Sequence, residues 1–342
     1  MEKLNILYSC DDNYAPYTGI SMTSLFENNQ DAAEITVYLA SMDISLENIR
    51  KMKQLAQQYS RNLVLLNTKA AQEKISQYHC KGWNGSLATW LRFFVFDQVP
   101  ENVEKLLWLD SDTIVQGSLQ PLFATNLGDA PVGCVCDSIC YRSRYRLGLS
   151  AEEPYYNAGV IQFNLPVWKK ENILPSMMQH LAANVSLYEA NDQDLLNDYF
   201  RGRIYKLSPL YNLLGIHLAY TPQQYFSVYH WEDNSYYSMQ QISQAAKSAV
   251  VVHFFRFLGD YPWEEGNNYH PARELYIHWR DRSLWKDHRG KPCRKDMVFR
   301  IEKILYRMLP KVVFLKIFYY ITNRNHPKAP VKRPESTAKG EV

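Results

Sequence analysis

The fold is decided by residues 106–115, which read Leu-Leu-Trp-Leu-Asp-Ser-Asp-Thr-Ile-Val. The apolar run from Val103 to Leu109 is typical of a strand that is buried on both faces of a parallel sheet. Asp110 and Asp112 follow where this strand meets its loop, at the edge where open α/β sheets place their ligands. Their apolar surroundings disfavour a solvated charged face, because carboxylates are almost never buried without a partner.

The two carboxylates predict a metal site. Residues i and i+2 of an extended chain point the same way, so we expect Asp110 and Asp112 to converge. Two unpaired carboxylates repel each other, whereas a divalent cation that prefers oxygen ligands removes the conflict and can also hold a diphosphate. The alternative is a turn in which the aspartates cap a following element, and a D-x-D pattern alone favours that alternative. The buried context favours the metal.

The rest of the chain predicts an α/β fold. Strands are expected at 4–9, 34–40 and 62–66, with amphipathic helices at 17–26 and 46–59. Such β-α-β units favour a parallel sheet with helices on both faces. A further helix is expected at 87–96, and short strands at 134–136, 160–163 and 250–253 are compatible with antiparallel strands added to a single mixed sheet.

Charge divides the 342-residue chain into an acidic body and a basic end. Residues 280–342 hold 17 Lys or Arg against 6 acids, whereas residues 1–279 hold 21 against 29. This asymmetry disfavours a nucleic-acid groove across the main domain and places any anionic partner at the C-terminal end. We expect a large domain at 1–279, a basic amphipathic helical extension at 280–324 and a disordered tail at 325–342.

The cysteine pattern and the apolar runs indicate a cytoplasmic protein. The six cysteines are irregularly spaced and lack the paired C-x-x-C arrangement of a zinc ribbon, so we interpret them as reduced, buried thiols. The first residues contain no apolar segment of signal-peptide length. The best apolar stretch, 312–321, is interrupted by Lys316 and falls short of the roughly 20 residues that a membrane span needs.

The C-terminal extension predicts peripheral attachment to a membrane. An apolar face is formed by Met297, Ile301, Ile304, Leu305 and Met308, and a basic face by Arg300, Lys303 and Arg307. Each Lys or Arg near an anionic leaflet contributes about 1 kcal/mol, so the extension can hold the protein at the inner face of the plasma membrane. The alternative is a helix that packs its apolar face on the main domain.

Residues 109–115 resemble the D-x-D segment of the retaining glycosyltransferases of family 8, which include bacterial lipopolysaccharide galactosyl- and glucosyltransferases and, more distantly, glycogenin. The resemblance runs from about Leu4 to Trp263 and rests on several motifs in order. It implies a GT-A fold with a Rossmann-like mixed sheet. It also implies a UDP-sugar donor, Mn²⁺ or Mg²⁺ as cofactor, and transfer of galactose or glucose to a hydroxyl of a cell-surface glycan. That acceptor is expected to be a lipopolysaccharide, a capsular polysaccharide or a glycoprotein or lipid-linked glycan.

The motif Ser-Cys-Asp-Asp-Asn-Tyr at 9–14 resembles the family's first-strand motif. By that resemblance Asp11 and Asn13 hydrogen-bond the uracil while Tyr14 stacks on it, and stacking on an aromatic ring stabilises a base by roughly 1–3 kcal/mol. The alternative is an Asp-Asn N-cap for the first helix. The family helix at 89–92 implies that Arg92 contacts the donor sugar and diphosphate, although alone it would be an ordinary surface arginine.

Three further segments resemble the sugar-binding motifs of the family. The roles implied for the transferred sugar fall on Asp137, Asn157, Ala158, Asp192 and Gln193. Asp192 would bind sugar hydroxyls and Gln193 would lie under the anomeric carbon, so these two are the catalytic candidates. The structural alternatives are a turn aspartate, a tight Asn-Ala-Gly turn into a strand, and an acidic helix N-terminus favoured by the helix dipole.

His253 matches the third metal ligand of the family, and an imidazole beside two carboxylates suits manganese. The segment after His253 departs from the family pattern H-x-x-G-x-x-K-P-W, because the loop to Trp263 is longer and Tyr261 stands in the place of the lysine. The family lysine contacts the diphosphate, and Arg256 is the candidate substitute. Gly259 in this loop and Ser111 of the D-x-D segment complete the predicted donor-binding residues.

The resemblance implies that the metal neutralises the departing diphosphate, with retention of configuration and with Gln193 or Asp192 stabilising positive charge at the anomeric carbon.

One alternative is a sugar- or nucleotide-binding protein with an impaired active site, which the missing lysine suggests. Another is a sugar-phosphate nucleotidyltransferase. The first strand is followed by 11–14 and not by a Gly-rich phosphate loop, which disfavours that second alternative.

Overall fold

A seven-stranded mixed sheet forms the centre of the protein in a computed structural model that describes residues 2–82, 86–230, 235–294 and 296–323. Its strand order is β3-β2-β1-β4-β7-β6-β8. The strands are β1 (Lys3–Asp11), β2 (Glu34–Met42), β3 (Asn62–Leu66), β4 (Lys105–Leu109), β6 (Val132–Cys136), β7 (Tyr156–Asn164) and β8 (Ile204–Lys206).

The sheet combines parallel and antiparallel pairs. β1 runs parallel to β2 and β4, and β2 runs parallel to β3. β7 lies between β4 and β6 and is antiparallel to both. The expected parallel sheet with added antiparallel strands is therefore confirmed, and the carboxyl ends of β1 and β4 meet at one edge.

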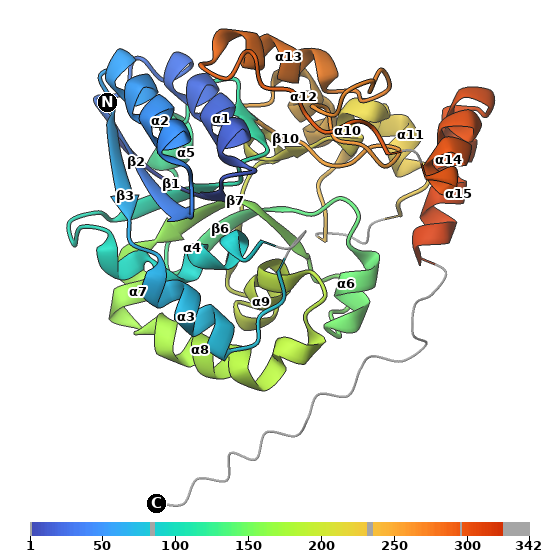
Figure 1. Cartoon of the computed structure of the whole chain (residues 1–342). Coiled ribbons are helices and arrows are strands. Elements are labelled where there is room, and N and C mark those ends of the chain that lie inside the picture. The colour runs from blue at the N-terminus through green and yellow to red at the C-terminus, as the bar shows by residue number, and fades with distance from the viewer. Residues whose placement is uncertain (1, 83–85, 231–234, 295, 324–342) are drawn as a thin grey trace, which may run out of the picture.

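Helices cover both faces of this sheet (Figure 1). One face carries α1 (Ala15–Glu27), α2 (Leu46–Gln58) and α5 (Gln120–Ala124). The other carries α3 (Lys69–Gln77), α4 (Leu91–Phe94), α7 (Leu165–Lys170), α8 (Ile173–Asn184) and α9 (Asn191–Tyr199). The helix expected at 87–96 is wrong in detail, because the segment folds as α4 between the 3₁₀ turns η1 (Ala88–Trp90) and η2 (Phe96–Gln98).

The expectation of a single sheet is also wrong. A second, three-stranded sheet has the order β5-β10-β9, formed by β5 (Thr113–Val115), β10 (Val251–His253) and β9 (Leu213–Leu214). The chain turns sharply after β4, so β5 leaves the main sheet and pairs antiparallel with β10. This small sheet brings residue 253 next to residue 113, although 140 positions separate them in the sequence.

The remaining helices follow the second half of the chain. They are α6 (Tyr141–Arg146), α10 (Ile216–Ala219), α11 (Pro222–Phe226), α12 (Met239–Ser248), α13 (Arg273–Arg282), α14 (Met297–Met308) and α15 (Lys311–Asn323), with the 3₁₀ turns η3 (Val185–Leu187) and η4 (Pro209–Tyr211). Figure 1 shows α14 and α15 at the side of the body near α11. Among the described residues, no helix combines the length and apolar content needed to cross a bilayer.

Of the extension expected at 280–324, α14 and α15 are helical, whereas residues 284–294 form no helix and α13 crosses the expected boundary at 280. α14 spans the predicted amphipathic segment, and its Met297 and Met308 side chains are each 76% exposed. All six cysteines are free thiols, and four of them are buried. The tail expected to be disordered at 325–342 lies outside the described residues.

Candidate functional site

The predicted acidic pair lies in a tight turn between β4 and β5. The backbone N–H of Thr113 donates to the carbonyl oxygen of Asp110 at 3.2 Å, and the Thr113 hydroxyl donates to the same oxygen at 2.8 Å. The expectation that strand alternation makes the two carboxylates converge is therefore wrong in its cause, since Asp110 and Asp112 do not lie in extended chain. The turn itself presents both side chains to one spot.

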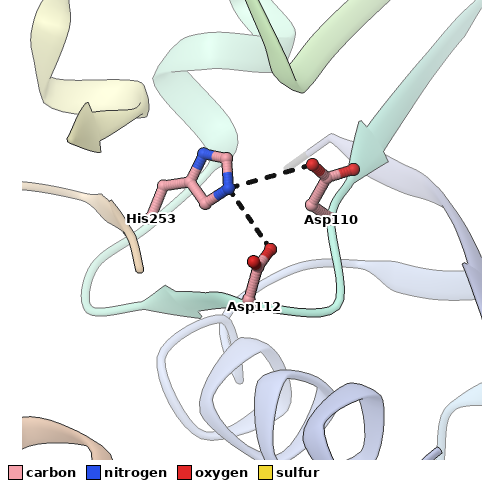
Figure 2. Close-up of side chains that lie close together, drawn as sticks. All are labelled: Asp110, Asp112 and His253. Atoms are coloured by element: carbon pink, nitrogen blue, oxygen red, sulfur yellow. Dashed lines mark ion pairs between the residues drawn. The ribbon is translucent and has the colours of Figure 1, made fainter. Parts of the chain in front are cut away.

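His253 completes a cluster of three metal-ligating side chains (Figure 2). Its Nε2 lies 3.2 Å from Asp112 Oδ1 and 3.8 Å from Asp110 Oδ2. One ligand atom from each residue lies within 4.8 Å of the others. Pairing of β10 with β5 sets this position, because His253 is in register with Thr113, directly after the turn.

The neighbours of these side chains orient them for a cation. Asp110 Oδ1 accepts hydrogen bonds from Arg92 Nη2 at 3.0 Å and from Trp108 Nε1 at 2.7 Å, which leaves Oδ2 on the side of His253. His253 Nδ1 donates to Asn212 Oδ1 at 3.1 Å, so Nε2 carries the lone pair that faces the carboxylates. Two carboxylates and one oriented imidazole are a donor set that fits Mn²⁺ or Mg²⁺.

The electrostatics of the cluster agree with a cation site. Burial lowers the pKa of His253, but the charges of Asp112 and Asp110 outweigh burial and hold that pKa above its usual range. Burial also raises the pKa of Asp110, with Arg92 opposing the rise and Asp112 adding to it. The two carboxylates therefore crowd negative charge into a confined space, and a bound cation would neutralise it.

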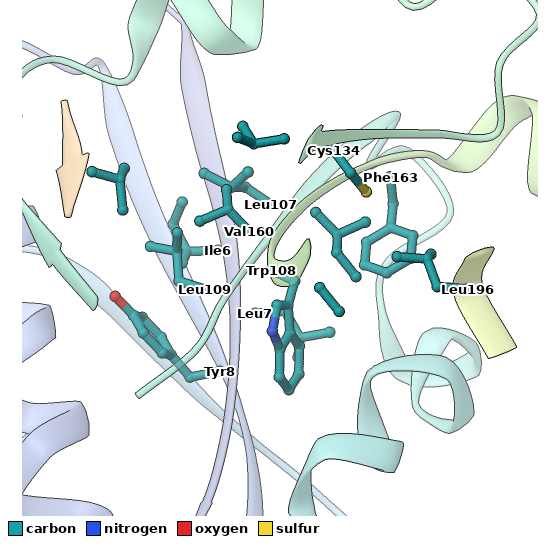
Figure 3. Close-up of a cluster of buried hydrophobic side chains, with 14 of the residues drawn as sticks. Ile6, Leu7, Tyr8, Leu107, Trp108, Leu109, Cys134, Val160, Phe163 and Leu196 are labelled. Atoms are coloured by element: carbon teal, nitrogen blue, oxygen red, sulfur yellow. The ribbon is translucent and has the colours of Figure 1, made fainter. Parts of the chain in front are cut away.

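The turn rests on a strand that is buried on both faces (Figure 3). Leu107 and Leu109 point to one side of β4, while Trp108 points to the other and is 1% exposed. The Arg92 guanidinium lies 4.1 Å from the centre of a Trp108 ring. Because β4 is packed on both faces, the direction in which the turn leaves the sheet is fixed.

Arg92 is buried and contacts several residues of the site. The alternative that it is an ordinary surface arginine is therefore wrong. The residue is 1% exposed, and besides Asp110 it pairs with Asp192 at 3.1 Å. It also donates to the carbonyl oxygens of Thr89 and Ala158. Its guanidinium holds the two acidic motifs together, and its contact with the donor stays a prediction.

The predicted sugar-binding residues form one hydrogen-bonded cluster beside the metal ligands. Gln193 Nε2 donates to Asp137 Oδ2 at 3.2 Å, and its Oε1 accepts from the backbone N–H of Ala158 at 3.0 Å. Asn157 Nδ2 donates to the same Asp137 oxygen at 3.0 Å. Gln193 also contacts the Tyr155 hydroxyl at 3.2 Å. Four positions from three separate motifs are thus brought together, although 56 positions separate the outermost two.

Asn212 is the residue that sequence reasoning missed. It is 1% exposed, and its Nδ2 donates to Asn157 Oδ1 at 2.8 Å while its Oδ1 accepts from His253. A single asparagine between η4 and β9 carries no motif, periodicity or charge pattern that would have revealed it. Asn212 connects the sugar-side cluster to the metal ligands.

The base motif lies at the carboxyl end of β1 and shares a cavity with the acidic turn. Tyr14 is the N-cap residue of α1, so the alternative of an Asp-Asn cap is wrong. Asp11 Oδ1 accepts from the Tyr14 backbone N–H at 3.1 Å, and Asn13 is exposed. A narrow cavity of about 90 Å³ extends from Asp11 and Tyr14 to Asp110 and Asp112.

A larger cavity of about 1030 Å³ opens outward from the base motif. Arg256, Tyr261 and Trp263 line it together with Asp11 and Asn13. The Tyr261 ring stacks on Trp263 with ring centres 4.4 Å apart, and the Arg256 guanidinium lies 4.6 Å from the centre of the Tyr261 ring. Tyr261, which stands in the place of the family lysine, and Arg256, the candidate substitute, are therefore in contact with each other.

Two predicted donor-binding residues have other partners in the fold. The Ser111 hydroxyl accepts from Thr18 Oγ1 at 2.8 Å and donates to the Ser9 carbonyl oxygen at 3.2 Å, so it ties the acidic turn to α1 and β1. Gly259 has a positive φ of 88° and packs against the Phe299 ring of α14. A donor contact for either residue stays a prediction.

Comparisons with known proteins agree with this geometry. The family model described as "Glycosyl transferase family 8" matches residues 5–266. A putative glycosyltransferase of Haemophilus influenzae is 27% identical over 214 residues, covering 62% of this chain and 63% of its own length. A lipopolysaccharide 1,2-glucosyltransferase of Escherichia coli (strain K12) is 24% identical over 309 residues, covering 87% of this chain and 84% of its own.

The solved structures establish the fold. The galactosyltransferase LgtC, in complex with donor and acceptor sugar analogues, superposes with a TM-score of 0.68 at 22% identity, covering 82% of this chain and 96% of that one. The chain therefore has the GT-A fold that the motifs predicted. Because the family model spans most of the chain and includes the base motif, the acidic turn and His253, the protein belongs to glycosyltransferase family 8.

Proposed function

We propose that this protein transfers a hexose from a UDP-sugar to a hydroxyl group of a cell-surface glycan, with a divalent cation bound by Asp110, Asp112 and His253. The observation that carries the proposal is the convergence of these three side chains, because two of them, Asp110 and Asp112, line the same narrow cavity as the base-motif residues Asp11 and Tyr14. The names of the relatives, which include lipopolysaccharide glucosyl- and galactosyltransferases, support a hexose donor and a glycan acceptor.

Mn²⁺ or Mg²⁺ at this position would neutralise the charge that develops on the departing diphosphate. Asp110 and Asp112 supply the negative ligands, and Asn212 keeps the His253 Nε2 lone pair directed at them. Asp11 and Tyr14, which supply a carboxylate and an aromatic face to the narrow cavity, bind the uracil together with the neighbouring Asn13. The nucleotide therefore extends from the uracil-binding residues to the metal ligands, and both sets of residues are held in place by the fold.

The cluster of Asp137, Asn157 and Gln193 binds the transferred sugar. Gln193 is held from two sides by Asp137 and the Ala158 backbone, so its amide is fixed in place before the substrate arrives. Such an oriented amide oxygen can stabilise positive charge at the anomeric carbon while the acceptor attacks from the face that the diphosphate leaves. Retention of configuration follows from this arrangement.

Incubation with a panel of UDP-sugars and Mn²⁺ tests the proposal, with UDP release and the anomeric configuration of the product as readouts. We expect UDP release with UDP-galactose or UDP-glucose, loss of it in EDTA, and an axial product from an axial donor. UDP binding without release would support the impaired binding protein instead. Consumption of UTP and a sugar phosphate would support the nucleotidyltransferase.

We also propose that α14 attaches the protein to an anionic membrane at the inner face of the plasma membrane. Ile301 and Ile304 are 50% and 53% exposed, while Lys303 on another side of the helix pairs with the buried Asp260 at 2.5 Å. The helix is therefore held on the body by one side and presents an apolar side outward. This geometry disfavours the alternative in which the apolar face packs on the main domain.

Sedimentation with vesicles tests this attachment. The wild type should bind vesicles that contain phosphatidylglycerol, and neither pure phosphatidylcholine vesicles nor high salt should support binding. The double variant I301S/I304S should lose most of the binding, whereas Leu46→Ser, which removes a 78% exposed leucine from α2, should not. Equal binding by all three proteins would contradict the role of α14.

A further inference from the structure

The large cavity beside the base motif has a wall that lies outside the family's matched region. The family model ends at residue 266, yet residues 284–294 form one side of the 1030 Å³ cavity. We call this segment the strap. Its lining residues are Leu284, Trp285, Asp287, His288, Arg289, Lys291, Pro292 and Arg294. The strap therefore lines the same pocket as the base motif.

The strap is anchored to the base motif at its start. The Trp285 ring covers Gly19 of α1 so closely that a Cβ at Gly19 would lie 2.1 Å from the ring. Trp285 Nε1 donates to Asn48 Oδ1 at 2.8 Å, and Asn48 Nδ2 donates to Asp12 Oδ1 at 2.9 Å. A short series of hydrogen bonds thus links the strap to the carboxyl end of β1.

The end of the strap is anchored to the loop that departs from the family pattern. The Lys291 carbonyl oxygen accepts from the Glu265 N–H at 2.9 Å, and the Arg294 N–H donates to Asp260 Oδ1 at 2.8 Å. A Cβ at Gly290 would lie 2.1 Å from the Trp263 carbonyl oxygen, so only glycine allows this approach. Because both ends are fixed, the strap can bind a ligand without first losing much conformational freedom.

Arg289, Lys291 and Arg294 are exposed side chains that line the cavity. The Arg289 guanidinium reaches the carbonyl oxygen of Lys286 at 3.5 Å, and that of Arg294 lies 5.5 Å from the centre of the Phe299 ring. Neither contact brings a carboxylate to these cations. The strap therefore contributes three cations, against the single carboxylate of Asp287, to the pocket that Asp11 and Tyr14 also line.

We propose that Arg289, Lys291 and Arg294 bind the phosphate groups of the nucleotide donor and supply the positive charge that the family lysine supplies elsewhere. The inference rests on the proposed function, and it explains how a donor site that has Tyr261 in the place of that lysine can hold a diphosphate. Guanidinium groups match phosphate oxygens in a bidentate geometry, and a nearby ammonium group adds a further charge. Tyr261 then accounts for the loss of the lysine's positive charge, and the strap cations account for its replacement.

The experiment measures binding of UDP, UMP and uridine to the full chain by isothermal titration calorimetry with Mg²⁺ present. Exposed charge pairs have modest individual effects, so Lys291→Gln should weaken UDP binding about 3-fold, and the triple variant R289Q/K291Q/R294Q about 10-fold or more. Uridine affinity should stay within about 2-fold of the wild type, because the strap acts on the phosphates. The triple variant should also show a weaker dependence of UDP affinity on salt.

Lys286→Gln is the matched control, since Lys286 is an exposed lysine of the same strap that does not line the cavity. It should bind UDP as the wild type does. If the wild type binds UDP and the triple variant binds it equally well, the strap proposal is overturned while the proposed function stands. If uridine affinity falls as much as UDP affinity, the strap shapes the base pocket and the phosphate assignment is wrong. If the wild type binds none of the three ligands, both proposals fail.

Discussion

The two ends of the donor site are built in opposite ways. At the inner end, Asp110, Asp112 and His253 lie on a turn and a strand, and their side chains are 23%, 17% and 11% exposed. At the outer end, a cavity of about 1030 Å³ is lined by the half-buried Arg256 and by the exposed cations of the strap. The inner end carries the residues that the family resemblance predicts, whereas the outer end has Tyr261 in the place of the family lysine.

The difference reflects how tightly each end is constrained. An inner side chain such as Asp110 has hydrogen-bond partners from α4 and β4, so a substitution disturbs several buried groups at once. A cation in the outer cavity contacts solvent, and another cation at a neighbouring position can provide the same charge. The inner end should therefore tolerate little change, and the outer end should tolerate replacement.

The largest effect is expected for Asp112→Asn. Removing one anionic ligand should lower transfer by about a thousandfold or more, because the cation then loses both charge and geometry. The fold should persist, since the side chain is partly exposed and the amide has nearly the same size. Turnover of UDP-sugar and the melting temperature are the two measurements. Asp129→Asn, at an exposed turn, is the matched control, and full metal-dependent activity of the Asp112 variant would remove the basis for the inner end.

The strand that leads to the inner end was predictable because burial leaves a clear sequence pattern. The apolar run that ends at Leu109 is β4, in which Leu106 to Leu109 are buried. The largely exposed edge strand β3 also has the predicted bounds, 62–66. The acidic pair could be found for the same reason, since charges that interrupt a buried run stand out. The turn that makes the pair converge could not be found, because its geometry depends on pairing of β5 with β10, far away in the sequence.

Residues without a local pattern were beyond sequence reasoning. Asn212 is linked to the site only through its contacts with Asn157 and His253, both more than 40 positions away. The helix expected at 87–96 is divided into η1, α4 and η2, and no residue pattern in the segment marks these divisions. The strap carries its cations on irregular chain, where neither helical nor strand periodicity applies.

A smaller effect is expected for Asn212→Ala, which tests whether the inner end depends on a residue that touches no substrate. Loss of the acceptor for His253 Nδ1 should weaken metal binding about 10- to 100-fold, because the imidazole is no longer held in one tautomer and orientation. Titration with Mn²⁺ measures this affinity, and thermal unfolding separates it from stability. Asn212→Asp keeps an acceptor and should restore much of the affinity, whereas Asn126→Ala at a site far from the metal ligands should have no effect. Unchanged Mn²⁺ affinity in Asn212→Ala would show that the imidazole needs no second partner.

The smallest effect is expected at the outer end, for Arg256→Met. Its guanidinium donates to the Gly259 carbonyl oxygen at 3.1 Å and stacks on Tyr261, so methionine preserves much of the packing while it removes the charge. One lost charged contact to a phosphate should weaken UDP binding about tenfold, with uridine binding unchanged. Calorimetry with UDP and uridine measures these affinities, and Arg300→Met on exposed α14 is the control.

Because the strap cations remain, Arg256→Met should keep measurable turnover with UDP-sugar, in contrast to Asp112→Asn. A complete loss of turnover would place Arg256 with the inner end and contradict the division of the site into a constrained part and a replaceable part.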